Sequence, residues 1–244
     1  MFQLCVTMVS MTDAPADARR ALFPAHYPEH VALWSRPEEE RKGTPLLVML
    51  HGYGSNEADL MGLAPYVPEQ FTVASLRAPQ ELAPGAYQWF PLMAAQDFAM
   101  EAVEAATEYV LAWLDDVRSQ HSSVTVLGFS MGMAMATSLI RRRPHDFAAV
   151  VGLSGFAIDP SAGGAPAEGY GYFLDGELDG TLPMFWGRDQ ADPVITQDKV
   201  EYTMGWVRGH VQLTKVTYPG IGHSVSAPEI AHVKEFLELS VLKG

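Results

Sequence analysis

The sequence has little of two things on which whole classes of protein depend. Cys5 is its only cysteine, so the chain has no intramolecular disulfide and no site built from several thiolates, and we expect it to be cytoplasmic. Its 244 residues include only 16 Lys and Arg against 29 Asp and Glu, a formal net charge of −13. Because nucleic-acid backbones are bound by positively charged surfaces, we expect no nucleic-acid partner.

The sequence also lacks an apolar run long enough to cross a bilayer as a helix. Residues 1–11 are apolar, but they lack the positively charged start that is typical of a signal peptide. We therefore expect residues 1–25 to form an N-terminal tail or an edge element, and we expect no stable insertion into a membrane.

Short apolar segments alternate along the chain with longer amphipathic ones. This alternation predicts an α/β fold with a mostly parallel central sheet and helices on both faces, in a single domain over residues 1–244. The expected strands are residues 30–35, 45–50, 71–76, 124–128, 148–153, 184–186 and 212–217. The expected helices are residues 57–64, 97–118, 131–143, 196–209 and 228–242. The charged residues 37–43 are expected to form a hairpin connection between the first two strands.

Two long segments without clear periodicity, residues 77–96 and 156–182, each follow a predicted strand. Loops of this length in a compact domain usually have a function, and ligands of open α/β sheets bind outside the carboxyl ends of the strands. We therefore expect both loops to lie near a ligand site. The acidic residues Asp175, Glu177 and Asp179 in the second loop are expected to be solvated charges.

The segment VTVLGFSMGMA, residues 124–134, places Ser130 where a predicted strand turns into a predicted helix. The arrangement strand, G-x-S-x-G, helix is typical of a nucleophilic serine held on a sharp turn. Gly128 and Gly132 fit this reading, because such a turn leaves no room for larger side chains at these two positions. Met131 begins the helix, so its backbone N–H is placed to stabilise an oxyanion. The alternative is a tight turn whose serine has no chemical role.

A nucleophilic serine needs a general base and a carboxylate that orients the base, and on this type of fold they follow it in the order acid, then histidine. His223 lies in a Gly-rich loop after the last predicted strand, where it can reach over the edge of the sheet. Asp189 and Asp192 both follow the preceding strand. Asp192 is favoured because it stands at the end of that loop, directly before Pro193. We expect Pro193 to be the first residue of a helix, and Asp192 would then also cap this helix.

The loop His51-Gly-Tyr-Gly54 follows the strand expected at residues 45–50 and offers a second oxyanion donor. Glycines let the backbone approach a ligand closely, so we expect the N–H of Tyr53 to act together with that of Met131. His51 ends a buried strand, and we expect it to bond to the neighbouring loop backbone rather than to act as a second base.

Six segments occur along the chain in this order: HGYGSNEADL, RAPQ with a later WF, GFSMGMAMA, LSG, GRDQADPVI and YPGIGHS. They resemble the motifs of the phospholipase/carboxylesterase family of α/β-hydrolases, which includes small bacterial carboxylesterases and acyl-protein thioesterases. The resemblance covers about residues 45–242. It implies Ser130 as nucleophile, Asp192 as acid, His223 as base, and the N–H groups of Tyr53 and Met131 as the oxyanion hole. It also implies a monomer or a homodimer, and the mechanism requires no metal or organic cofactor.

The chain departs from the pattern of this family in two places that bear on the substrate. Met131 stands where members commonly have Gln, which makes the surface beside the nucleophile more apolar, and residues 156–182 are longer than the compact pattern needs. The candidate walls of the substrate pocket are Tyr87, Trp89, Phe90, Met93 and Phe156, although aromatic residues under a long loop also fill cores.

These residues favour small-molecule substrates, namely apolar or aryl esters of short to medium acyl chain. A thioesterase or a lysophospholipase would use the same triad, and so would perhydrolysis. A binding protein without catalysis on the same fold is a further alternative, although such proteins usually lose a member of the triad.

Overall fold

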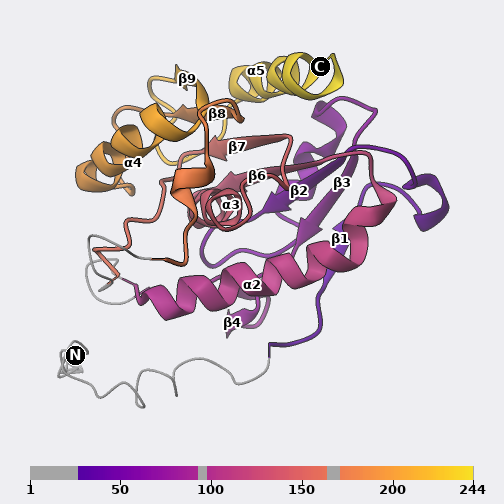
Figure 1. The fold of residues 1–244 in the computed structure, drawn as a ribbon, viewed down its shortest axis with the longest axis horizontal. Helices are drawn as coiled ribbons and strands as arrows, with labels where there is room; N and C mark the ends of the chain where they lie inside the picture. Colours follow the sequence, from indigo (N-terminus) through magenta and orange to yellow (C-terminus); the bar gives the residue numbers. More distant parts are fainter. Residues whose placement is uncertain (1–26, 93–97, 164–170, 244) are drawn as a thin grey trace, which may run out of the picture.

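The computed structural model describes residues 27–92, 98–163 and 171–243, and its centre is a twisted seven-stranded sheet (Figure 1). The order of the strands across the sheet is β1-β3-β2-β6-β7-β8-β9. All neighbouring pairs are parallel except β1 with β3. The strands are β1 Ala32–Trp34, β2 Leu46–Leu50, β3 Thr72–Leu76, β6 Val124–Phe129, β7 Ala149–Leu153, β8 Pro183–Arg188 and β9 Gln212–Thr217.

Helices cover both faces of this sheet, with α2 and α5 on opposite sides of it (Figure 1). One face packs against α2, α3 and α4, and the other packs against α5 and η3. The helices are α2 Met100–Val117, α3 Met131–Arg142, α4 Gln197–His210 and α5 Ala227–Leu237, with a π-helical turn at Glu238–Leu242 and short 3₁₀ turns η2 Glu38–Glu40, η3 Leu60–Tyr66, η5 Arg118–Gln120 and η6 Asp175–Glu177. Within the described ranges no helix is both long enough and apolar enough to cross a membrane.

The central strands form because their sequences suit burial on two faces. β2 reads LLVML and β7 reads AVVGL, and every residue of both strands is buried. Parallel strands covered by helices on both sides are expected to be continuous apolar runs of this kind. The predicted mostly parallel sheet with helices on both faces is therefore confirmed, and the seven predicted strands occur with only small shifts at their ends.

Two predictions in the first third of the chain were wrong. Residues 57–64 form no α-helix; the chain instead makes the 3₁₀ segment Leu60–Tyr66, and Pro65 inside it has no N–H with which to continue a helix. Residues 37–43 are not a hairpin connection. β1 pairs antiparallel with β3, so β3 separates β1 from β2, and Glu38–Glu40 forms a 3₁₀ turn.

The loop expected at residues 77–96 contains a small hairpin. Its strands are β4 Gln80–Ala83 and β5 Ala86–Gln88, which pair antiparallel around Gly85. Gly85 has a φ of 79°, a backbone conformation that glycine adopts without strain. Tyr87 then exchanges two backbone hydrogen bonds with the loop after β2, donating to the carbonyl of Ser55 at 2.8 Å and accepting from Gly54 at 2.8 Å. The hairpin therefore supports the loop that follows β2.

Asp175 is not the solvated loop charge that the sequence suggested. It accepts hydrogen bonds from Nε and Nη2 of Arg141 at 2.8 and 2.7 Å, and Arg141 is only 1% exposed. The Arg141 guanidinium also lies 4.0 Å from the ring centre of Phe173 and 5.2 Å from that of Trp206. A buried guanidinium requires such a carboxylate, so this pair fixes the end of the second long loop against α3 and α4. Glu177 and Asp179 are exposed, as expected.

The N-terminus of α5 carries a buried carboxyl group, Glu229, which is 0% exposed. Ser226 and Glu229 form a capping box: the Glu229 N–H donates to Oγ of Ser226 at 3.3 Å, and the Ser226 N–H donates to Oε2 of Glu229 at 3.3 Å. The other oxygen, Oε1, lies against the backbone of Gly187 in β8 and has no hydrogen-bond partner among the described residues. Burial raises the pKa of this carboxyl to about 7.

Glu229→Gln is expected to remove a pH-dependent loss of stability. Because the pKa of Glu229 is higher in the folded protein than its ordinary value near 4.5, the unfolded chain releases this proton first as pH rises. The free energy of unfolding therefore falls as pH rises from about 4.5 to 7, and it remains at the lower value above pH 7. A glutamine cannot ionise, so the variant should gain about 2–3 kcal/mol relative to the natural protein between pH 5 and pH 8.

Urea unfolding at pH 5 and pH 8 measures this difference. The control is Glu235→Gln, which changes an exposed carboxyl on the same helix. A free-energy difference between natural protein and Glu229→Gln that is the same at both pH values would contradict the assignment of a raised pKa to Glu229.

Candidate active site

Ser130 lies directly after β6, on a sharp turn that requires glycine at neighbouring positions. Its φ is 55° and its ψ is −118°, which is an unfavourable conformation for a residue with a side chain. A Cβ added at Gly128 would overlap the carbonyl of Gly132, and one added at Gly132 would overlap the carbonyl of Leu50 in β2. Both glycines are therefore required for β6 and α3 to pack this closely, and the turn holds Ser130 at the edge of the sheet.

The structure brings together the three side chains that the sequence suggested as a triad. Nε2 of His223 lies 2.9 Å from Oγ of Ser130, and Nδ1 of His223 lies 2.9 Å from Oδ2 of Asp192. Because a carboxylate only accepts, Nδ1 carries the proton and donates to Asp192, which leaves Nε2 to accept from the hydroxyl of Ser130. The three residues follow β6, β8 and β9, whose carboxyl ends meet at one edge of the parallel sheet.

The carboxylate of Asp192 is held in place from its other side. Its side chain has no exposed surface, and its Oδ1 accepts backbone hydrogen bonds from Val194 at 2.8 Å and from Ile195 at 3.2 Å. These bonds close a turn before α4. The expectation that Asp192 caps the helix directly, with Pro193 as its first residue, was wrong, because α4 begins at Gln197.

Asp189, the other candidate acid, faces the backbone instead of His223. It is 3% exposed, and it accepts from the N–H of Ala191 at 2.9 Å and from the N–H of Gly222 at 2.8 Å. The hydrogen bond from Ala191, followed by that from Gly222, keeps the pKa of Asp189 below its ordinary value. Gly222 directly precedes His223, so Asp189 joins the loop of the acid to the loop of the histidine.

Ser154 makes a second connection of this kind, and the sequence analysis assigned it no role. It follows β7, it is fully buried, and its φ is 44° although it is not a glycine. Its N–H donates to the carbonyl of Gly187 at 2.9 Å, and its Oγ donates to the carbonyl of Ser224 at 3.0 Å. Ser224 is the residue after His223. The only sequence signal was the position of Leu-Ser-Gly directly after a buried strand, and that position does not reveal the partner of the hydroxyl.

The two expected oxyanion donors lie on either side of Ser130. Met131 is the first residue of α3, and the loop of Tyr53 passes beside the serine: a Cβ added at Gly52 would lie 3.5 Å from Cβ of Ser130. Within the described ranges, neither the N–H of Tyr53 nor that of Met131 donates to a protein acceptor. Free backbone donors beside a serine hydroxyl are the groups that an oxyanion hole requires.

His51 has a structural role, as expected. It is fully buried, its Nδ1–H donates to the carbonyl of Gly52 at 2.8 Å, and its Nε2 accepts from the N–H of Ala78 at 3.1 Å. Burial lowers the pKa of this imidazole and keeps it neutral. The indole N–H of Trp89 donates to the carbonyl of His51 at 2.9 Å. This hydrogen bond ties the loop after β2 to the core.

The structure corrects part of the expected substrate pocket. Trp89 and Phe90 are 0% exposed and belong to the core, so they have no surface for a substrate to contact. Tyr87 is half-buried beneath the guanidinium of Arg77, and Phe156 is buried with the amine of Lys199 5.3 Å from its ring centre. Met93 lies outside the described residues.

Tyr53, in the loop that passes beside Ser130, is 50% exposed, although the sequence suggested a role for its backbone alone. Among the residues that the structure describes, no three His, Cys, Asp or Glu side chains gather in a way that would hold a metal ion.

Comparison with known proteins identifies the family of this chain. The family described as Phospholipase/Carboxylesterase matches residues 37–241. The putative hydrolase MhqD of Bacillus subtilis is 22% identical over 213 residues, covering 82% of this chain and 97% of MhqD. The acyl-protein thioesterase 1 of Debaryomyces hansenii is 29% identical over 122 residues, 49% of each chain. The crystal structure of the Bacillus cereus carboxylesterase superposes with a TM-score of 0.67 at 22% identity, covering 87% of this chain and 94% of that one.

The family match spans most of the chain, and the superposition on the carboxylesterase extends over most of both chains. The protein therefore belongs to the Phospholipase/Carboxylesterase family, and it is a serine hydrolase with the α/β-hydrolase fold.

Proposed function

We propose that this protein hydrolyses neutral esters, apolar or aryl and of short to medium acyl chain, through an acyl-enzyme intermediate on Ser130. The observation that carries the proposal is the hydrogen-bonded series from Ser130 to His223 to Asp192, with 2.9 Å at each step. This is the contact distance that a base needs in order to remove the proton of a nucleophile as it attacks.

In the first step, Oγ of Ser130 attacks the ester carbonyl carbon while Nε2 of His223 takes the hydroxyl proton. Asp192 accepts from Nδ1–H, so it keeps the imidazole in the required tautomer and stabilises the imidazolium. The carbonyl oxygen becomes negatively charged, and the backbone N–H groups of Tyr53 and Met131 donate to it. Collapse of this intermediate expels the alcohol, which takes the proton from Nε2 of His223.

In the second step, water replaces the alcohol. His223 removes a proton from the water as its oxygen attacks the acyl carbon, and the same two N–H groups stabilise the second oxyanion. The intermediate then releases the carboxylic acid, and Oγ of Ser130 recovers its proton from His223. Apart from the ester and water, both steps use only groups of the chain itself.

The preference for neutral, apolar substrates rests on the Tyr53 loop and on the charge of the protein. The side chain of Met131 is only 3% exposed and packs in the core, so it offers a substrate little surface, whereas Tyr53, in the loop that passes beside Ser130, is 50% exposed. The formal net charge of −13 repels anionic esters. Tyr87 remains a candidate contact because it is half-buried next to the Tyr53 loop.

A thioesterase activity is the second candidate. The acyl-enzyme chemistry is the same, and a thiolate leaves in place of an alkoxide. The similarity to an acyl-protein thioesterase over about half of the chain favours it.

Ser130→Ala is expected to lower kcat for p-nitrophenyl butyrate by about 10⁶, because loss of a triad nucleophile removes covalent catalysis. The same change should abolish labelling by a fluorophosphonate probe, which reacts with an activated serine. The matched control is Ser122→Ala, an exposed serine just before the amino end of β6. Turnover or labelling of Ser130→Ala at the natural level would refute the assignment of the nucleophile.

Ser154→Ala is expected to lower kcat about 10-fold with little change in KM. Alanine has the same backbone strain as serine at this position, but it removes the hydrogen bond to the carbonyl of Ser224 that holds the His223 loop. Small displacements of a catalytic group reduce the rate much more than they reduce binding. Fluorophosphonate labelling should slow in parallel with kcat.

The control for this experiment is Ser138→Ala, which removes a buried hydroxyl that bonds only within α3, to the carbonyl of Ala134. Thermal unfolding confirms that both variants are folded. If folded Ser154→Ala and Ser138→Ala have the same kcat, Ser154 has no positioning role.

A graded series of p-nitrophenyl esters and matched thioesters tests the proposed substrate class. We expect kcat/KM to be highest for acyl chains of short to medium length, and to fall at least 10-fold when a neutral acyl chain is replaced by one that ends in a carboxylate. Thioesters preferred over esters of the same chain would favour the second candidate. Equal or better turnover of the anionic esters would contradict the proposed preference.

A further inference from the structure

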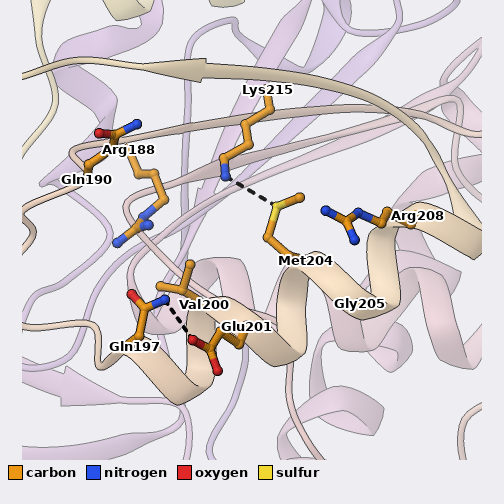
Figure 2. A pocket seen from close by; sticks show the side chains of 9 residues that line it. All are labelled: Arg188, Gln190, Gln197, Val200, Glu201, Met204, Gly205, Arg208 and Lys215. Atoms are coloured by element: carbon orange, nitrogen blue, oxygen red, sulfur yellow. Dashed lines mark hydrogen bonds between the residues drawn. The ribbon is translucent and has the colours of Figure 1, made fainter.

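A hollow of about 520 Å³ lies between one face of α4 and the strands β8 and β9 (Figure 2). We call it the α4 pocket and define it by six residues that line it: Arg188, Gln197, Glu201, Met204, Arg208 and Lys215. Arg188 ends β8, Lys215 lies on β9, and the other four form one face of α4. Figure 2 shows the cationic ends of Arg208 and Lys215 directed toward the same space, with the guanidinium of Arg188 on its far side.

The charge of the α4 pocket is opposite to that of the whole protein. Three of its side chains are cations, and the only carboxylate, Glu201, already accepts a hydrogen bond from Nε2 of Gln197 at 3.0 Å. Within the described part of the chain, Arg188, Arg208 and Lys215 make no ion pair within 4.0 Å. A protein with a formal net charge of −13 thus places around one hollow three cations that have no ion-pair partner among the described residues. The ammonium of Lys215 donates instead to Sδ of Met204 at 3.2 Å, and it lies 4.8 Å from the ring centre of Trp186.

Arg188 makes this arrangement costly in the absence of a ligand. It is only 5% exposed, and its Nε has no hydrogen-bond partner among the described residues. A buried guanidinium with an unused donor loses hydration without full compensation. Burial lowers the pKa of Arg188, and burial followed by the nearby charges of Arg188 and Arg208 lowers the pKa of Lys215. The cations therefore repel one another, and an anion between them would relieve that repulsion.

We propose that the α4 pocket binds the phosphate group of a small ligand. A phosphate offers several acceptor oxygens and up to two negative charges, which suits two planar guanidinium groups and one compact ammonium group. The pocket volume lies in the range of small-molecule sites and exceeds the volume of phosphate alone, so it has room for an organic group that carries the phosphate.

The phosphate site is separate from the ester site. None of the residues that line the α4 pocket belongs to the proposed triad or oxyanion hole. The two sites nevertheless share the loop between β8 and α4, since Arg188 opens the segment that leads to Asp192. The carboxylates of Asp189 and Asp192 attract the guanidinium of Arg188. They therefore offset part of its positive charge when no anion is bound in the pocket. Binding of phosphate is therefore independent of the hydroxyl of Ser130.

Calorimetric titration with inorganic phosphate and with glycerol 3-phosphate tests the proposal, with ionic strength held constant by chloride. The test variant is Arg208→Gln with Lys215→Met, two exposed side chains whose loss leaves the core intact. We expect the natural protein to bind both phosphates, and the double variant to bind them at least 10-fold more weakly. The matched control Lys234→Gln removes an exposed cation on α5, on the other face of the sheet, and should bind as the natural protein does.

Ser130→Ala separates this site from the ester site, and it should bind phosphate with unchanged affinity. Three results would overturn the proposal: no heat beyond that of chloride together with no binding to vesicles that contain phosphatidic acid, equal binding by the folded double variant, or loss of binding in Ser130→Ala. A failure of these titrations leaves the proposed esterase activity unaffected, since that activity is tested by turnover and labelling.

Vesicles distinguish the source of the phosphate. Binding of glycerol 3-phosphate in solution identifies a soluble phosphate monoester. Binding only to phosphatidylcholine vesicles that contain phosphatidic acid, with loss in the double variant, identifies a lipid headgroup. Either result supports a phosphate site in the α4 pocket, whereas equal binding to vesicles of phosphatidylcholine alone would overturn it.

Discussion

The arrangement of the whole site depends on how closely α3 packs against the ends of β2 and β6. The backbone of Gly132 contacts the carbonyl of Leu50, and the backbone of Gly128 contacts that of Gly132, with no room for a Cβ at either position. This contact forces the chain through a sharp turn in which Ser130 has a φ of 55°. The strain is balanced by the buried strands on both sides, because a packed core resists relaxation. A hydroxyl at the edge of the sheet and a free N–H at the start of α3 both follow from that turn.

The remaining parts of the site are positioned by hydrogen bonds between loops. Asp189 joins the loop after β8 to Gly222, and Ser154 joins the end of β7 to the residue after His223. These hydrogen bonds are buried, so each contributes more to the stability of the loops than a solvent-exposed hydrogen bond would. Loss of one of them would leave a buried polar group without a partner. The imidazole of His223 is thus held between a fixed acid and a fixed serine, at 2.9 Å from each. Such preorganisation is what a short-lived oxyanion requires.

Charge divides the surface near this edge into two regions. The protein as a whole is strongly acidic, whereas the α4 pocket gathers Arg188, Arg208 and Lys215. The two regions meet at the loop that carries Asp192. Arg188 is therefore influenced both by the acids of this loop and by the pocket, and its burial makes both influences strong.

The sequence by itself determined the strands of the seven-stranded sheet and the helices α2 to α5, because apolar runs such as LLVML suit burial on both faces of a sheet. It also identified Ser130, Asp192 and His223, which lie together in the structure. It did not reveal the partners of Asp175, Ser154 or Arg188. Their roles depend on the groups that lie near them after folding. Asp175 accepts from Arg141, and Ser154 donates to the carbonyl of Ser224. Arg188 lines one pocket with Arg208 of α4 and Lys215 of β9. It likewise overestimated Trp89 and Phe90 as pocket walls, since aromatic residues in a loop read alike whether they face a ligand or the core. The local sequence pattern specifies a helix or strand and its buried faces. Contacts between residues distant in sequence form only in the tertiary structure, because they depend on how these helices and strands pack against one another.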